Sequence, residues 1–260
     1  MPADKADLYH LLADLAHEAD VPGMMAADFA VECADLVEVR DRLAHPERGS
    51  VLANRAGYGL SYVKRLRAAI DHYRDRDPIR LVAVGCSGSK HTDADPLPAA
   101  RRYKGGYWTN KREYAEAAGE EWRIISAEHD LLHPATPIHD YERTPSDLEG
   151  VPVDVDGRLP SGDSVDTLLD LWALRVYEGL TTWIRDIATG PDPREIELEI
   201  LLGLAYHKPL DARGVFDALR GPGGLDISHP FREVDGLTGI GKQRGWLADE
   251  TAAIRDGDRS

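Results

Sequence analysis

Two short polar segments, each following an apolar run, contain the residues of this sequence that are best suited to chemistry. The first is GCSGSK, residues 85–90, which follows the run IRLVAV. Its glycines let backbone N–H groups converge, its hydroxyls add donors and Lys90 adds charge, so the segment suits an anion such as phosphate. Its spacing is not the GxxxxGK[ST] of a P-loop. Ser87, Ser89 and Lys90 are candidate anion ligands, and Cys86 is a candidate nucleophile if a neighbour favours its thiolate; the alternative is a small-residue turn around a buried cysteine.

The second polar segment is SAEHD, residues 126–130, which follows the run EWRII. Histidine is the side chain best placed for proton transfer near neutral pH, so His129, with Ser126 beside it, is a candidate catalytic residue. A hydrogen-bonded structural histidine is the alternative. His129 and His133 have the i, i+4 spacing of HExxH zinc sites, but Asp130 stands where that motif has its glutamate. We therefore expect no metal and no other cofactor.

A basic and aromatic stretch separates the two segments. From Pro96 to Arg112 the chain has five basic residues and no acidic one, with three aromatic residues interleaved. Such a composition suits a phosphate-bearing ligand or stacked bases. Arg102, Tyr103 and Lys104 are therefore candidate ligand-binding residues, and a solvated loop is the alternative.

The elements that must position these segments alternate between strand and helix. Short apolar runs predict strands at 79–85 and 121–127, and a strand or a strand followed by a turn at 195–206. Helical patterns cover 110–119, 162–188 and 211–220, and Ser161, Asp163 or Ser164 is expected to cap the long one. The alternation predicts an α/β fold with a mainly parallel sheet flanked by helices. Such folds bind ligands at the carboxyl ends of strands, where both polar segments fall.

The chain before this region reads as a separate helical domain. Apolar residues recur at offsets of three and four through most of residues 5–76, and RDRDP then interrupts the pattern. We expect a helical domain over 1–77 and an α/β domain over 78–260.

Two Gly-hydrophobic-Gly triplets resemble the turn of helix-hairpin-helix elements, in which backbone N–H groups at a helix start meet a DNA phosphate. Each triplet is followed by basic residues, and a plain helix–helix turn is the alternative for both. The candidate nucleic-acid-binding residues are Gly57, Gly59, Lys64 and Arg65 in the first, and Gly239, Gly241 and Lys242 in the second.

The overall charge is strongly acidic. Among 260 residues, 46 are acidic and 31 basic, only seven of them lysine, which gives a formal net charge of −15. This composition resembles that of a salt-loving archaeon, in which high salt screens the repulsion between surface charges. DNA contacts would weaken in such salt. Neither of the two cysteines has CxxC spacing, and no signal core or membrane-spanning apolar run is present, so we expect a cytoplasmic protein without a membrane partner.

Several short motifs, taken in order, resemble the YaaA-like family, domain of unknown function 6884. They are CSGSK, PAARRYKGGYW, REYAE, EWRIISAEHDLL and TPIHDYERT, from Cys86 to about Thr144, and the C-terminal PFREVDGLTGIGKQRGWL is similar too. The polar residues of the family fall on Cys86, Ser87, Lys90, Tyr103, Ser126, His129 and Tyr141. The family lysine before its histidine is Glu128 here, and the family glycine after it is Asp130. Asp tolerates the positive φ that such a glycine implies better than most residues.

The resemblance implies a function without settling a reaction. Members are often labelled peroxide stress proteins, and their relatives suggest association with DNA or nucleobases. We expect this protein to bind or act on nucleic acid or a nucleotide-like ligand, and Tyr141 joins the candidate ligand-binding residues. The enzyme version is glycosylase- or hydrolase-type chemistry on a base or nucleotide with Cys86, His129 and Ser126. The alternatives are a non-enzymatic DNA-binding stress-response module and a thiol redox protein, for which Cys33 would have to lie near Cys86.

Overall fold

The computed structural model describes residues 77–188, 194–220 and 225–257. Contacts divide the chain into two compact units, and one of them comprises the described residues in 80–183, 197–219 and 227–257. The helices, strands and contacts described below lie in this unit, apart from the ends of a few helices and strands that extend beyond it. The predicted N-terminal helical domain lies almost wholly outside the described residues, and so do Gly57, Gly59, Lys64 and Arg65.

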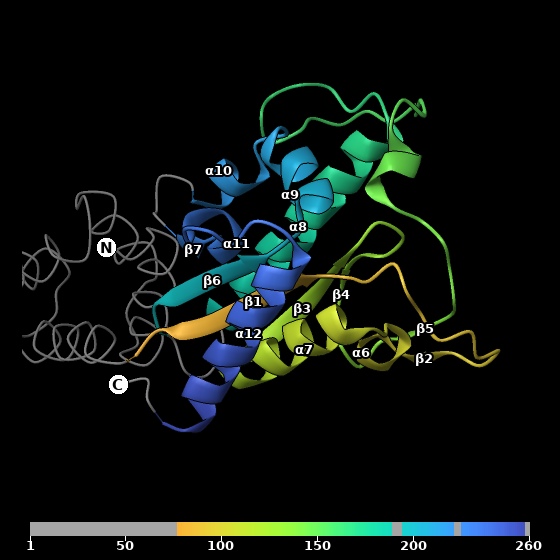
Figure 1. The fold of residues 1–260 in the computed structure, drawn as a ribbon. Helices are drawn as coiled ribbons and strands as arrows, with labels where there is room; N and C mark the ends of the chain where they lie inside the picture. Colours follow the sequence, from red (N-terminus) through yellow and green to blue (C-terminus); the bar gives the residue numbers. More distant parts are fainter. Residues whose placement is uncertain (1–76, 189–193, 221–224, 258–260) are drawn as a thin grey trace, which may run out of the picture. The chain divides into compact units, whose positions relative to one another are not determined.

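A mostly parallel sheet forms the centre of the described region (Figure 1). Its order is β4-β3-β1-β6-β7. The bounds are β1 Ile79–Gly85, β3 Glu121–Ser126, β4 Asp130–Leu132, β6 Ile196–Leu201 and β7 Asp226–Ser228. β1 runs parallel to β3, and β4 is antiparallel to β3. Helices flank this sheet, so the predicted α/β class is confirmed.

The central strands form around short apolar runs in their sequences. Residues 81–84 of β1 have no exposed surface, and Ile124 and Ile125 of β3 have none either. A strand buried on both faces reads as an apolar run rather than as an alternating pattern. This is why the predicted strands at 79–85 and 121–127 match β1 and β3.

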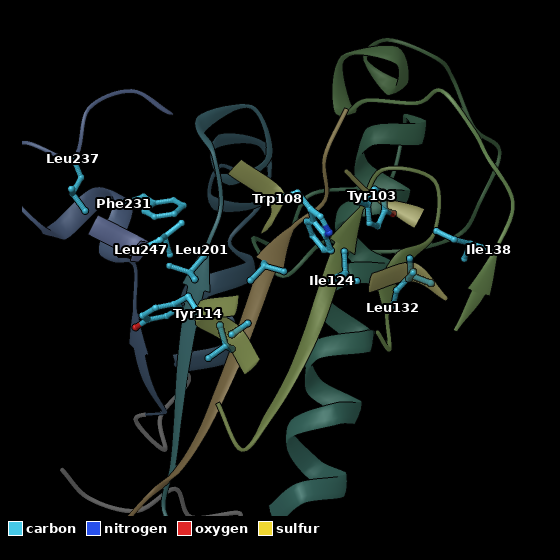
Figure 2. Close-up of a cluster of buried hydrophobic side chains, with 14 residues drawn as sticks. Tyr103, Trp108, Tyr114, Ile124, Leu132, Ile138, Leu201, Phe231, Leu237 and Leu247 are labelled. Atoms are coloured by element: carbon cyan, nitrogen blue, oxygen red, sulfur yellow. The ribbon is translucent and has the colours of Figure 1, made fainter. Parts of the chain in front are cut away.

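Two helices pack together over the sheet and enclose the main apolar core. They are α7, Gly106–Ala118, and α12, Ile240–Arg255. Figure 2 shows Tyr114 of α7 and Leu247 of α12 in the same cluster as Leu201 of β6, all three without exposed surface. The predicted helix over 110–119 is therefore confirmed, but it begins four residues earlier, at Gly106.

The long helix α8, Leu168–Ala188, begins later than the sequence pattern indicates. Thr167 and Asp170 form its first turn: the Asp170 carboxylate accepts the Thr167 N–H at 2.8 Å, and Thr167 Oγ1 accepts the Asp170 N–H at 3.2 Å. This reciprocal pair is a capping box. The predicted caps Ser161, Asp163 and Ser164 are therefore wrong.

The remaining elements are short. They are β2 Leu97–Pro98, α6 Ala99–Arg102, β5 Pro137–Ile138, the 3₁₀ helix η1 Pro145–Leu148, α9 Leu204–Asp211, α10 Val215–Arg220 and α11 Pro230–Glu233. Within residues 195–206, predicted as a strand or a strand followed by a turn, the strand ends at Leu201, before α9. The predicted helix over 211–220 is interrupted at Gly214, whose φ of +72° ends one helix before the next begins. No helix within the described ranges is both long and apolar enough to span a membrane.

Candidate functional site

The two polar segments meet because β1 and β3 are parallel neighbours that end together. Gly85 lies opposite Ile125 in the register, and the Cys86 N–H donates to the Ile125 carbonyl at 3.0 Å. Cys86 and Ser126 thus follow paired residues at one edge of the sheet. The expected position of both segments at the carboxyl ends of strands is confirmed.

The SAEHD segment forms a tight turn that is tied down at Ser126. Its buried hydroxyl accepts the N–H groups of Glu128 and His129, both at 3.2 Å, and its carbonyl accepts the Trp172 indole N–H at 2.8 Å. Asp130 has a φ of +55°, as the glycine of the resembling family implied, and leads the chain back as β4. The turn therefore fixes the direction in which the imidazole of His129 extends.

Tyr141 is the residue around which the predicted site residues converge. Its hydroxyl lies 2.7 Å from Ser126 Oγ and 2.7 Å from the Tyr103 hydroxyl. The His129 ring meets it edge to face with centroids 5.0 Å apart. Lys90 Nζ lies 4.1 Å from the centroid of the Tyr141 ring and 5.9 Å from that of Tyr103. Side chains that follow β1 and β3 therefore form one group with Tyr103, which follows α6, and Tyr141, which follows β5.

Lys90 is the unusual member of this group. The residue is only 8% exposed, and its backbone forms an isolated β-bridge with Tyr103. Within the described part of the chain its ammonium has no hydrogen-bond or ion-pair partner; the tyrosine rings are its contacts. Cation–π attraction offsets part of the cost of burying a charge, but an anion would offset far more. The arrangement is suited to a ligand with a negative group.

Two titratable residues of the turn have shifted pKa values. Burial lowers the pKa of His129, against the opposing effect of the Glu128 carboxylate, so its imidazole is neutral at pH 7 and can accept a proton. Burial raises the pKa of Asp130 to about 6, with Arg175 opposing and Glu128 adding to the shift. Glu128 itself pairs with Arg143 at 2.9 Å, which offsets the charge that it introduces beside His129.

Cys86 has two neighbours that sequence reasoning did not select. Tyr206 of α9 places its hydroxyl 3.1 Å from the Cys86 sulfur. Lys111 of α7 is buried, and its ammonium donates to the carbonyls of Gly85 and Cys86. Burial lowers the pKa of Lys111 to about 8, with Cys86 opposing the shift. Tyr206 follows the end of a third strand, β6, and that position was the signal that could have identified it.

The serines of the first segment fold it against the chain near Tyr103. Ser87 Oγ donates to the Lys104 carbonyl at 3.1 Å and accepts the Ser89 N–H at 3.3 Å. The Lys104 N–H donates to the Ser89 carbonyl at 3.0 Å. The side chains of Ser89 and Lys104 are exposed, and the contacts of Ser87 hold the loop's shape.

Arg102 is placed differently from the other predicted ligand-binding residues. It has no exposed surface, and its five N–H groups donate to four backbone carbonyls, those of His91, Asp93, Asp95 and Ile138. No guanidinium N–H is left for a ligand in this arrangement. We therefore assign Arg102 to the support of the site and leave it out of the ligand-binding group.

The name strand-end cluster is used below for the residues that the structure brings together. They are Cys86, Lys90, Tyr103, Ser126, His129, Tyr141 and Tyr206. The segment His129–His133 is a turn followed by β4, so its two histidines do not share a helical face. In the residues that the structure describes, no three His, Cys, Asp or Glu side chains are grouped to hold a metal ion.

The C-terminal glycine triplet is separate from this cluster. Gly239, with a φ of +87°, stands at the N-cap of α12. Gly239, Gly241 and Lys242 are all exposed, and a side chain added at either glycine would meet no atom within 4 Å. The turn is therefore open to a partner.

The fold and the cluster define an α/β protein with a polar site at the carboxyl ends of its central strands. A family model described as "Family of unknown function (DUF6884)" matches residues 81–249, and the chain belongs to this family. The match covers every residue of the strand-end cluster. The search of curated proteins found no match.

Proposed function

We propose that this protein binds a nucleotide or nucleobase-type ligand at the strand-end cluster and acts on it. The observation that carries the proposal is Lys90, a residue that is only 8% exposed and whose ammonium lies over two tyrosine rings without a hydrogen-bond or ion-pair partner among the described residues. A phosphate or another anionic group of the ligand would supply its missing counter-charge.

The other groups of the cluster suit the rest of such a ligand. The hydroxyls of Tyr103 and Tyr141 and the imidazole of His129 are donors and acceptors of the kind that read the polar edge of a heterocyclic base. They lie within one group beside the ammonium. The likeness to the YaaA-like family, whose relatives suggest nucleobase or DNA association and a stress response, supports the same ligand class.

The enzyme version of the proposal assigns roles to three residues. Cys86 is the reacting group, because its sulfur is half-buried at the end of a central strand. His129, neutral at pH 7, accepts or returns a proton. Ser126 fixes the turn that carries His129. Chemistry at a base or at its glycosidic bond is the reaction class.

Replacing Lys90 with methionine tests the ligand site. The probes are a panel of nucleoside monophosphates, the matching nucleosides and inorganic phosphate, measured by calorimetry and thermal shift. We expect the wild type to bind at least one monophosphate, and Lys90→Met to bind it about 10–100-fold more weakly, because a charge-assisted hydrogen bond is lost.

The matched control for this test is Lys208→Met, since Lys208 is an exposed lysine of α9. It should bind the monophosphate as the wild type does. Binding that is equal in Lys90→Met and the wild type, or absent from the wild type for every probe, would contradict the proposal.

A second candidate function is DNA binding without chemistry, through the start of α12. The observation that favours it is the open turn at Gly239 and Gly241, followed by exposed Lys242 and Arg244. The first turns of α7 and α12 also touch, since the Tyr107 hydroxyl donates to Gln243 Oε1 at 2.5 Å. Two helix starts at one surface favour a phosphate backbone.

A thiol redox function would need Cys33, which lies outside the described residues.

Changes at Gly241 and Lys242 test the DNA-binding candidate. Gly241→Leu should block backbone approach without disturbing the fold, because open space surrounds that position. With a double-stranded DNA oligonucleotide in low salt, we expect Gly241→Leu and Lys242→Gln each to weaken binding about tenfold, and Lys242→Gln to lower the salt slope by about one. Cys86→Ala should bind as the wild type does. If Cys86→Ala lost DNA binding and the α12 variants kept it, this candidate would fail.

A further inference from the structure

The segment that carries Tyr141 is a coil fixed at its two ends. It comprises residues 139–144, between β5 and η1, and is called the Tyr141 strap below. Before it, Ile138 is buried and pairs with Leu97 of β2. After it, Leu148 of η1 is buried as well. Every residue of the strap except Tyr141 is exposed, so the strap lies at the surface between two anchored points.

Between these points the strap is held by side chains and hardly at all by its backbone. Among the described residues, the backbone from 139 to 143 makes one hydrogen bond, from the Tyr141 N–H to the adjacent Asp140 carboxylate at 3.0 Å. Two side chains join the strap to the rest of the fold. The Tyr141 hydroxyl lies 2.7 Å from each of two hydroxyls of the strand-end cluster, and Arg143 Nη1 lies 2.9 Å from Glu128 Oε2. A surface segment with so few contacts opens at a lower free energy than the central strands do.

The strap covers the ammonium of Lys90. Lys90 is 8% exposed, and its Nζ lies 4.1 Å from the centroid of the Tyr141 ring. Tyr141 itself is partly exposed, so its ring lies on the solvent side of the ammonium. An anion that approaches the ammonium from that side meets the ring first, and Tyr141 must move before the anion can form a hydrogen bond with Nζ.

We propose that the Tyr141 strap is a lid over the anion site at Lys90, and that the ion pair between Glu128 and Arg143 is the latch that holds the lid closed. Ligand enters and leaves when the strap lifts, and the strap closes again over the occupied site. The inference rests on the proposed function, which places an anionic group of the ligand at Lys90. It adds how access to that site is regulated.

The two sides of the latch are held differently, as a gate requires. Glu128 belongs to the tight turn that follows β3, and its N–H donates to the Ser126 hydroxyl at 3.2 Å. Arg143 belongs to the strap. The two side chains are 30% and 44% exposed, and an ion pair of this exposure contributes little to stability and weakens as salt rises. The pair can therefore break and form again while the fold stays intact.

Acylation of Lys90 in the full chain measures the opening of the strap without any ligand. Acetic anhydride forms an amide bond to an accessible lysine nitrogen and releases acetate, and mass spectrometry of peptides gives the rate at each lysine. Glu128→Gln and Arg143→Gln each break the latch, so we expect each to raise the acylation rate of Lys90 about two- to fivefold. A direct effect of charge on the amine would have opposite signs, because one variant loses a negative charge and the other a positive one. The double variant should be no faster than the faster single variant, since either change removes the whole pair.

References within the same protein separate the opening of the strap from other effects. Glu142→Gln, at an exposed residue of the strap, is the matched control and should leave the Lys90 rate unchanged. In every variant the exposed Lys208 should react at its wild-type rate, and the buried Lys111 should stay slow, which would show that the fold itself has not opened. Wild-type Lys90 rates in both latch variants, or changes of opposite sign, would overturn the proposal.

The kinetics of ligand binding provide a second measurement. The probe is the nucleoside monophosphate of the panel above that the wild type binds most tightly. A latch that closes over the empty and the occupied site slows entry and exit alike. Both latch variants should therefore raise the association and dissociation rates about two- to fivefold and leave Kd within about twofold. A change in Kd with an unchanged dissociation rate would show instead that the two charges steer the ligand, and the latch would then be wrong.

Failure of the lid and failure of the proposed function give different results. If no monophosphate binds while the latch variants expose Lys90, the strap does cover the ammonium, and the nucleotide is the wrong ligand class. If a monophosphate binds while acylation and both binding rates match those of the wild type, the ligand class stands and the lid is wrong.

Discussion

Replacing Arg102 with methionine is expected to lower the free energy of unfolding by about 3–5 kcal/mol, because four backbone carbonyls lose their donor at once. The guanidinium joins the segment 91–95 to β5 through five hydrogen bonds, and its side chain has no exposed surface. Methionine fills a similar volume but donates nothing. Arg102 holds the segment 91–95, which follows Lys90, and it directly precedes Tyr103 in the chain. The same change should therefore also loosen the strand-end cluster.

Urea unfolding provides the measurement, and Arg101→Met provides the matched control. Arg101 is the preceding residue of α6 and is exposed, so its loss should change the free energy of unfolding by no more than about 0.5 kcal/mol. Arg102→Lys should be intermediate, because one ammonium cannot reach four carbonyls. A loss below about 1 kcal/mol in Arg102→Met would show that water replaces the guanidinium.

Arg102 also illustrates what the sequence could not reveal. In the sequence it is one of five basic residues in an acid-free stretch, and charge alone indicates a ligand. Whether a basic side chain points outward to a ligand or inward to backbone carbonyls depends on the tertiary fold. The two neighbours differ in this way: Arg101 is exposed, whereas Arg102 is buried.

The parts that the sequence did predict are those with a strong local signal. β1 and β3 are apolar enough to be read as buried strands, and once they are parallel neighbours their ends must meet. That reasoning placed Cys86 and Ser126 together, and the resemblance to a family added Tyr141. The start of α8 was missed because several residues before it can cap a helix, and only the fold selects Thr167.

Tyr206 and the role of Lys111 depend on contacts between distant segments. Tyr206 is separated from Cys86 by 120 positions, and only its place shortly after β6 distinguishes it from other tyrosines of the sequence. In the sequence Lys111 is one of the five basic residues of the stretch 96–112, and nothing there indicates that it is buried on α7. Both act on the residue that the sequence identified first.

The second large expected effect concerns Lys111. This lysine should make the stability of the protein depend on pH, and replacing it with methionine should remove that dependence. Its pKa falls from the ordinary 10.5 to about 8 because burial penalises the charged ammonium. Below pH 8 both folded and unfolded chains hold the proton, and the folded state bears the full cost of burying the charge. Between pH 8 and pH 10.5 only the unfolded chain holds it, so stability from this group rises with pH.

The expected size follows from the shift. Between about pH 7 and pH 9.5, the free energy of unfolding of the wild type should rise by about 2 kcal/mol relative to that of Lys111→Met. The two proteins must be compared with each other because tyrosines also make stability depend on pH. The raised pKa values of these tyrosines lower stability at higher pH, and they do so equally in both proteins. Lys208→Met, at an exposed lysine, should show no such difference from the wild type.

Urea unfolding at a series of pH values provides the result. If the difference between the wild type and Lys111→Met stays constant from pH 7 to pH 9.5, the ammonium is solvated and cannot support the strand end as described. If the difference grows, a charge is held beneath Cys86 at a measurable cost in stability. A cost of that kind is expected where a buried ammonium is hydrogen-bonded to backbone carbonyls instead of paired with a carboxylate, and it would tie Lys111 to the strand end that carries Cys86.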